Sequence, residues 1–179
     1  MAKLAKVGYG QLELNQVAFP RDGRIEAQCA LSTTDFSETT PAENGMILAI
    51  DNVTRTITLP TGGANEVLGL NYSSEHIYDE RLVGGLKHFK LVPGEFYPRL
   101  GLLSVGDKFT TNTVSLTTAY DELTDTKLKT GVYMVPGTDG YWTETADVSK
   151  ATASVIARVI KKTTMPDGQK AVKLQIVKA

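Results

Sequence analysis

Residues 154–177 read SVIARVIKKTTMPDGQKAVKLQIV, and this stretch decides the fold class. Segments 154–162 and 170–177 are rich in β-branched residues and flank the turn signal Pro166-Asp167-Gly168. Glycine adopts positive φ at no steric cost and aspartate tolerates it, so Asp-Gly between extended segments is typical of a hairpin. The stretch therefore predicts two antiparallel strands.

A helical interpretation competes at the start of this stretch. Four small or apolar residues have the spacing of one helical face: Val148, Ala151, Val155 and Val159. We favour a strand from Ser154, because the valine–isoleucine pairs are β-branched and the turn leads straight into a second alternating segment. A short helix over 146–153 stays open.

The same turn signal occurs at Pro20-Arg21-Asp22-Gly23 and again at 136–140. The segments that these two turns would join are 11–19 with 24–31, and 128–135 with 141–145. A further hairpin is predicted between 46–50 and 53–59, with a two-residue turn at Asp51-Asn52. We therefore predict a mainly β protein, an antiparallel β-barrel or β-sandwich with an extended N-terminal arm and few short helices.

The long polar segment 32–45 is the best candidate for a boundary in the chain. It divides residues 1–45, an N-terminal arm and hairpin, from a β domain over 46–179. Within that domain we predict an irregular β lobe over 46–100 and a barrel-like core over 101–179. Residues 1–10 are expected to be a flexible segment that becomes ordered on a partner.

Composition excludes several classes of protein. The 19 basic and 20 acidic residues are well mixed, so no basic stripe for nucleic acid is present. No run approaches the roughly 20 apolar residues of a membrane helix, and the N-terminus does not resemble a signal peptide. The single cysteine excludes an intrachain disulfide. We expect synthesis in a reducing cytoplasm, with no nucleic-acid or membrane partner.

The strongest metal candidate combines His76, His88 and Asp79, since imidazole and carboxylate ligands suit zinc or iron. The sequence around them has no His-x-His, no cysteine partner and no helix that would fix their spacing. We therefore predict no metal site, no cofactor and no catalytic residues. A metal-dependent enzyme that uses His76 and His88 is kept as an alternative.

Two further polar candidates have ordinary structural interpretations. Cys29 falls on one face of segment 24–31 with Ile25, Ala27 and Leu31, so we predict a buried small apolar residue rather than a nucleophile. The carboxylates of Asp121, Glu122 and Asp125 match neither a calcium loop nor a glycosidase pair. They predict a solvated turn.

Trp142 and the tyrosines near it could form a carbohydrate-binding surface. Aromatic side chains are also common in β cores and protein interfaces, and we favour that interpretation. A tail, baseplate or fibre module that binds carbohydrate or another virion protein is therefore an alternative function.

Several segments together resemble a known class of protein. They are YGQLELNQ at 9–16, FPRDGRIEAQ at 19–28, ENGM at 43–46, PRLGLL at 98–103 and PDGQKAV at 166–172. In style they resemble small structural proteins of tailed bacteriophages, particularly head decoration or auxiliary capsid proteins encoded near the major capsid protein. The resemblance implies a β-barrel or β-sandwich that binds and reinforces the outer capsid lattice, often as a homo-oligomer.

The expected function is therefore a non-enzymatic virion protein on the capsid surface, with the major capsid protein as its partner. The expected contact residues are Leu4, Val7, Tyr9 and Leu12. A short segment with these side chains can lie across a neighbouring subunit and add β pairing, becoming ordered as it binds.

Overall fold

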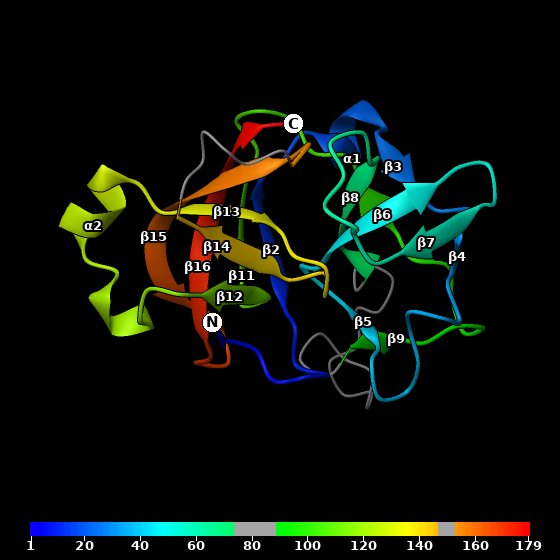
Figure 1. The fold of residues 1–179 in the computed structure, drawn as a ribbon, viewed down its shortest axis with the longest axis horizontal. Helices are drawn as coiled ribbons and strands as arrows, with labels where there is room; N and C mark the ends of the chain where they lie inside the picture. The colour runs from blue at the N-terminus through cyan, green and yellow to red at the C-terminus, as the bar shows by residue number, and fades with distance from the viewer. Residues whose placement is uncertain (74–88, 147–152) are drawn as a thin grey trace.

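The computed structural model describes residues 1–73, 89–146 and 153–179, and it is built mainly of β-strands (Figure 1). The largest sheet has the strand order β1 (Ala2–Lys3), β12 (Val114–Leu116), β14 (Trp142–Thr145), β13 (Tyr133–Pro136), β15 (Ile156–Thr164), β16 (Lys170–Lys178), β11 (Lys108–Thr111) and β2 (Leu12–Gln16). A six-stranded sheet has the order β3 (Ile25–Glu26), β10 (Leu100–Gly101), β8 (Leu68–Asn71), β6 (Ile47–Asp51), β7 (Thr56–Thr58) and β4 (Ala30–Leu31). A two-stranded sheet pairs β5 (Ala42–Glu43) with β9 (Lys90–Leu91). The mainly β prediction is confirmed.

The pairing is largely antiparallel, with parallel contacts between β12 and β14 and between β4 and β7. In the described residues the sheets are not closed into a barrel, so the barrel alternative and the barrel-like core predicted over 101–179 are wrong. The arrangement is compatible with the predicted sandwich. Described helical segments are short: α1 (Phe19–Asp22), the 3₁₀ turn η2 (Tyr120–Glu122) and α2 (Asp125–Thr130). The predicted carboxylate turn thus begins in η2 and leads into α2, rather than forming an irregular loop.

Two of the three Asp-Gly turns join antiparallel strands, as predicted. The third turn connects β15 and β16, whose register runs from Thr164 opposite Lys170 to Ile156 opposite Lys178. The strand interpretation of this stretch is confirmed, and a helix over 155–159 is wrong. Most of the optional helix at 146–153 lies outside the described residues. The second turn connects β13 and β14.

The strand predicted over 128–135 begins later than expected. Leu128 belongs to α2, which Thr124 caps by accepting a hydrogen bond from the Lys127 N–H at 3.3 Å. Leu128 is buried in the large core, and Arg158 of β15 donates to its carbonyl oxygen at 2.9 Å. Packing of α2 against β15 therefore takes this segment out of the sheet.

The first Asp-Gly turn is not a hairpin, and that prediction is wrong. Residues 19–22 form the helical turn α1, and Gly23 ends it at φ 69° with its N–H donating to the Phe19 carbonyl. The flanking strands then join different sheets, since β2 pairs with β11 whereas β3 pairs with β10. Segment 24–31 also divides into β3 and β4, which leaves Ala27 exposed.

The hairpin of β6 and β7 is confirmed, but its turn is longer than predicted. Asp51 pairs with Thr56, so four residues lie between the strands instead of two. The Asp51 carboxylate accepts hydrogen bonds from the N–H groups of Val53 at 2.8 Å and Thr54 at 3.2 Å. Hydrogen bonds from Thr54 and Val53 lower the pKa of Asp51.

The larger hydrophobic core joins the two larger sheets. Ile47 and Leu70 of the six-stranded sheet belong to the same buried cluster as Phe109, Trp142 and Leu174 of the eight-stranded sheet. A second cluster includes Leu31, Leu48, Ile57, Leu91 and Tyr141. The larger cluster thus draws on residues on both sides of the predicted division at 100–101.

Trp142 has no exposed surface. Its ring centroid lies 5.7 Å from that of Phe109, and its indole N–H donates to the Gly45 carbonyl at 3.2 Å. A carbohydrate surface built on Trp142 is therefore wrong, because the indole is enclosed in the core.

Candidate functional site

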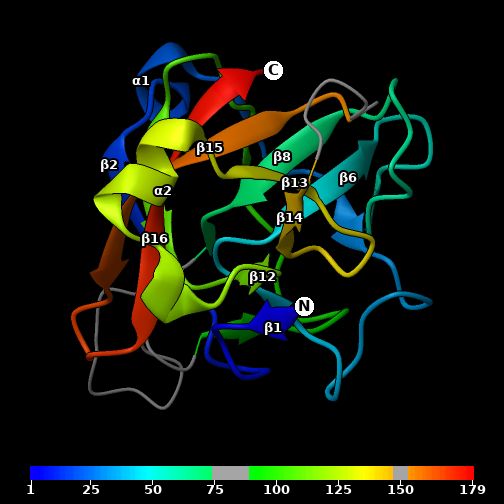
Figure 2. The ribbon, with the colours of Figure 1, turned by 60° about the vertical axis from the view of Figure 1, so that its left-hand side comes forward.

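The N-terminal arm, defined as residues 1–10, lies against its own chain. Strand β1 pairs with β12, with Ala2 opposite Leu116 and Lys3 opposite Ser115 (Figure 2). The N–H groups of Leu4 and Ala5 then donate to the carbonyls of Val114 and Asn112, each at 3.1 Å. The arm was expected to become ordered on a partner; here it adds a strand to its own sheet.

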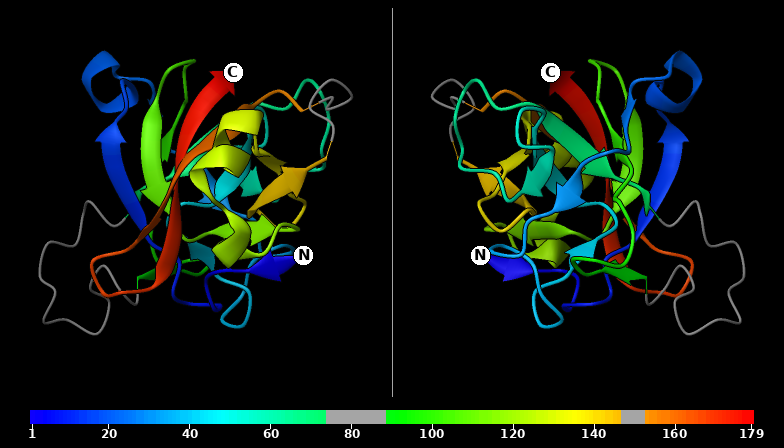
Figure 3. Two further views of the ribbon diagram at one scale, coloured as in Figure 1. Left: turned by 90° about the vertical axis from the view of Figure 1, so that its left-hand side faces the viewer. Right: turned by 90° about the vertical axis from the view of Figure 1, so that its right-hand side faces the viewer.

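Asn112 anchors the place where the arm returns toward β2. This buried side chain accepts from the Gln11 N–H at 2.7 Å and donates to the Tyr9 carbonyl at 2.9 Å. It also donates to Gln169 Oε1 at 3.2 Å, in the turn between β15 and β16. That turn and β1 lie at the end of the molecule opposite α1 (Figure 3). Asn112 therefore ties the arm to the third Asp-Gly turn.

A groove, called here the arm groove, opens between these two segments, with a volume of about 430 Å³. Its lining residues come from both: Leu4, Lys6, Tyr9, Asp167, Gln169 and Lys170. Asp167 Oδ2 accepts from Gln169 Nε2 at 2.6 Å and from Gln11 Nε2 at 2.8 Å, which holds the wall in place. The lining of the groove combines Leu4 and Tyr9 with two lysines, an aspartate and a glutamine.

A smaller cavity of about 150 Å³ lies at another part of the arm, lined in part by Lys3, Val7, Glu43, Asp139 and Tyr141. Lys3 Nζ lies 2.7 Å from Asp139 Oδ2 and 4.1 Å from the centroid of the Tyr141 ring. This placement combines an ion pair with a cation–π contact. Lys3 is thus held by two groups from the 139–141 segment.

Glu43 forms the buried wall of that cavity and is 1% exposed. Its carboxylate accepts from the Gly10 N–H at 2.5 Å and from the Tyr141 hydroxyl at 3.3 Å. Burial and the negative charge of Glu43 raise the pKa of Tyr141 above its usual value. A tyrosine held neutral here acts as a hydrogen-bond donor to the carboxylate, so the pair is a structural link.

The four predicted contact residues fall in different places. Leu4 and Tyr9 meet in the arm groove, whereas Val7 lines the smaller cavity. Val7 and Tyr9 are exposed, at 57% and 38%, while Leu4 and Leu12 are partly buried against the large core. Leu12 therefore serves mainly to attach β2.

Other wall residues of the arm groove were not predicted: Lys6, Asp167, Gln169 and Lys170. The sequence marked Asp167 as a turn residue, but no local pattern indicates that this turn meets residues 4–9. Their contact depends on the buried Asn112, which the sequence did not single out.

A second exposed apolar feature lies on the loop before β10. Phe96 and Tyr97 are 66% and 62% exposed and are adjacent in the chain. They are the described aromatic side chains with the greatest exposure.

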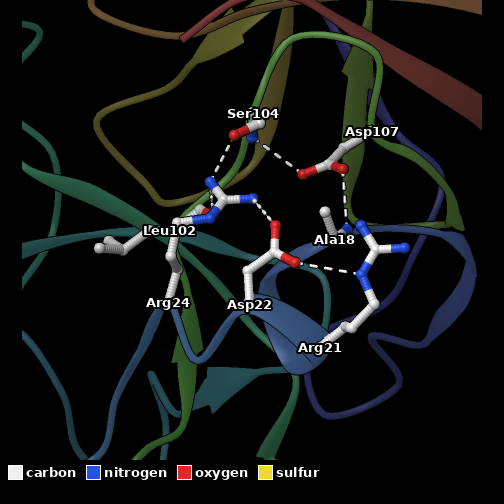
Figure 4. Close-up of polar contacts among 7 residues, drawn as sticks. All are labelled: Ala18, Arg21, Asp22, Arg24, Leu102, Ser104 and Asp107. Atoms are coloured by element: carbon white, nitrogen blue, oxygen red, sulfur yellow. Dashed lines mark hydrogen bonds and ion pairs between the residues drawn. The ribbon is translucent and has the colours of Figure 1, made fainter.

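A polar cluster connects α1 to the loop between β10 and β11 (Figure 4). The Asp107 carboxylate accepts from the Ala18 N–H at 2.9 Å and from the Ser104 N–H at 2.8 Å. Arg24 donates to the Leu102 carbonyl at 3.0 Å and to the Ser104 hydroxyl, and it also lies 3.6 Å from Asp22. These charged groups are engaged by their own chain and hold two loops together.

The remaining candidates are the alternative metal ligands and Cys29. His76, Asp79 and His88 lie outside the described residues. Within residues 1–73, 89–146 and 153–179, no group of three histidine, cysteine, aspartate or glutamate side chains is placed to hold a metal ion. Cys29 is 3% exposed, which confirms the prediction of a buried thiol.

In the part of the chain that the structure describes, no helix has the length and apolar character needed to cross a membrane. In comparisons with known proteins, no family model, no curated protein and no solved structure matches this chain.

Proposed function

We propose that this chain is a structural virion protein that binds the major capsid protein lattice and so decorates and stabilises a phage head. The proposal rests on the resemblance of its sequence segments to head decoration proteins and on the surface around the arm. One observation carries it furthest. Of the nine large apolar side chains exposed in the described residues, three belong to the first nine residues: Met1, Val7 and Tyr9.

Protein interfaces combine an apolar centre with a polar rim. The arm groove contains both kinds of group, since Leu4 and Tyr9 line it together with Lys6, Asp167 and Lys170. The lysines and the aspartate supply both signs of charge for pairing with a partner. Hydrogen bonds of Asp167 and Asn112 hold the wall formed by Tyr9 and Gln169, so little ordering of that wall is needed when a partner docks.

The test is co-sedimentation of the full-length chain with purified, expanded capsids. Tyr9→Glu places a charge in the arm groove, and Tyr97→Glu makes the same change on the exposed loop before β10. We expect wild type and Tyr97→Glu to sediment with capsids, and Tyr9→Glu to bind at least about tenfold more weakly, a loss of about 1.4 kcal/mol. Wild type that stays in the supernatant at micromolar concentration would overturn the proposal. Full binding by Tyr9→Glu would exclude the arm groove.

A second candidate is a tail, baseplate or fibre module that binds carbohydrate. The exposed pair Phe96 and Tyr97 favours it, because aromatic faces can pack against sugar rings. A glycan-binding screen with wild type and Tyr97→Ala tests it. Binding that Tyr97→Ala abolishes would support this function, and a screen without any binding glycan would remove it.

A further inference from the structure

The place that β1 occupies is complementary to its sequence. Backbone pairing with β12 sets the register, and Lys3 meets both Asp139 and the Tyr141 ring. Ala5 follows and is 4% exposed. A second copy of the chain carries the same residues, so its arm can form the same contacts in this place.

The attachment of the arm within one chain buries few side chains. Both residues of β1 are exposed, and the side chains of Lys3 and Asp139 are 42% and 43% exposed. An ion pair of that exposure contributes about 0–1 kcal/mol. Burial is confined to Ala5 and part of Leu4. Local opening of residues 1–5 is therefore expected to cost much less than global unfolding.

Departure of the arm leaves β12 as an open sheet edge. Val114 and Leu116 beneath it are buried, at 0% and 2% exposure, and the Val114 carbonyl loses the Leu4 N–H. The Asn112 carbonyl loses the Ala5 N–H but still accepts from the Val114 N–H at 2.8 Å. An unpaired edge over apolar side chains is a template for another strand. Residues 1–5 of another copy can pair with this edge and form all the contacts that the chain's own arm forms there.

Residues 6–8 have the properties of a hinge. The next part of the chain stays in place, because Asn112 holds Tyr9 and Gln11 while Glu43 holds Gly10. One hydrogen bond, from the Tyr9 N–H to the Lys6 carbonyl at 3.0 Å, closes the turn. Gly8 has φ 82° and nothing within 4 Å of the position of a Cβ, so other conformations are open to it.

Val7 lies at the middle of this hinge and is 57% exposed. Three extended residues reach about 10 Å, so exchanged arms require two copies in direct contact. Val7 would then lie at the junction between copies and lose its contact with water. Tyr9 lies outside the hinge and keeps its place in the arm groove.

We infer that the arm is exchanged between copies: residues 1–5 of one subunit pair with β12 of the next, where Lys3 binds Asp139 and Tyr141. The exchange links subunits into an oligomer, and it does not depend on what that oligomer binds.

A disulfide trap distinguishes the two arrangements. Lys3 and Ser115 are directly opposite each other, and the Cβ atoms of such pairs lie about 4.5–5.5 Å apart, close to disulfide range. The variant carries Lys3→Cys and Ser115→Cys, with Cys29→Ala to remove the native thiol. Each single-cysteine variant in the same background controls for chance collision.

After mild oxidation of the native protein, a non-reducing denaturing gel and intact mass show where the bond formed. Exchange predicts covalent dimers or larger species in the double variant, lost on reduction and scarce in both controls. A monomer with an internal disulfide would overturn the inference, and so would two free thiols, since the arm would then lie on β12 of neither copy.

A second measurement does not depend on disulfide formation. Deletion of residues 2–5 removes one buried side chain, Ala5, and the partly buried Leu4, and it uncovers the edge of β12. We expect it to lower the mass of the oligomer in sedimentation velocity while cooperative thermal unfolding persists. An unchanged oligomer mass would contradict exchange. Co-sedimentation of the wild type with capsids tests the capsid function separately. If the wild type binds capsids while the double-cysteine variant forms an internal disulfide, the arm exchange is wrong and the capsid function is still supported.

Discussion

Tyr141 donates its hydroxyl hydrogen to Glu43 across 3.3 Å, although the two residues are 98 positions apart. Both are buried, at 2% and 1% exposure. The pair links the second Asp-Gly turn to β5, and Gly10 completes the group by donating its N–H to the same carboxylate. One carboxylate therefore holds three distant segments of the chain together at the base of the arm.

Replacement of Tyr141 by phenylalanine removes one donor from a buried carboxylate. A buried acceptor that loses its partner costs about 1–3 kcal/mol. We expect Tyr141→Phe to lower the free energy of unfolding by that amount in urea denaturation. Unchanged stability would show that the hydrogen bond to Glu43 contributes nothing.

Tyr141 also predicts an alkaline limit to stability. Burial and Glu43 raise its pKa in the folded chain above the ordinary value of 10.0, so only the unfolded chain loses this proton near that pH. The stabilisation is complete below about pH 10 and is lost as pH rises toward the folded pKa. The free energy of unfolding should fall above about pH 10 in wild type and fall less steeply in Tyr141→Phe. Parallel pH curves for the two proteins would contradict this.

Gly45 occupies a position that only glycine fits. Its φ is 86°, and an added Cβ would overlap the hydroxyl oxygens of Thr111 and Thr113. We expect Gly45→Ala to lower the free energy of unfolding by about 2–5 kcal/mol, from backbone strain and overlap together. Gly62 has φ 84° with nothing within 4 Å of a Cβ, so Gly62→Ala is the matched control. That control should lose about 1–2 kcal/mol. Equal losses in both variants would exclude the overlap.

The Asp107 carboxylate joins the start of α1 to the β10–β11 loop, so its loss should lower the free energy of unfolding. Asp107→Ala leaves the N–H groups of Ala18 and Ser104 without their acceptor, which should cost about 2–4 kcal/mol in chemical denaturation. Asp121→Ala is the control, because its side chain is 83% exposed and lies 3.4 Å from Lys170. That variant should stay within about 0.5 kcal/mol of wild type. A similar loss in both would contradict the role of Asp107.

Cys29 should react slowly in the folded chain. Burial, and next the negative charge of Glu26, raise the pKa of the thiol, and 3% of the residue is exposed. At pH 8 we expect Ellman's reagent to modify Cys29 slowly in the native protein and rapidly in denaturant. The reaction in denaturant should give one thiol per chain. Complete reaction of the native protein within seconds would show that local opening next to β4 readily exposes the Cys29 thiol to the reagent.

The turns show how far local sequence predicts this fold. Residues 136–140 and 166–168 join strands that are neighbours in the chain, and there the local pattern was sufficient. At 20–23 it failed, because proline before a glycine with positive φ also suits a helical turn that glycine ends. The pairings of β2 with β11 and of β3 with β10 decide between the two, and they involve distant residues that no local pattern reveals.

Local sequence likewise indicates some residues of the candidate site and not others. The sequence predicted partner contacts for Leu4, Val7, Tyr9 and Leu12, and their role in binding stays a prediction. The neighbours of the arm were not predicted, since Asp139 and Asp167 reach the arm through contacts across most of the chain. The carbohydrate surface suggested for Trp142 was wrong, because the local sequence around an aromatic residue in a strand does not show whether its side chain faces solvent or the core.

Electron cryo-microscopy of purified capsids mixed with the full-length chain tests the central claim most directly. We predict added density on the outer capsid surface, with Tyr9, Lys6 and Lys170 of the arm groove facing the major capsid protein. Capsids without added density, or density in which the arm groove faces solvent, would contradict it.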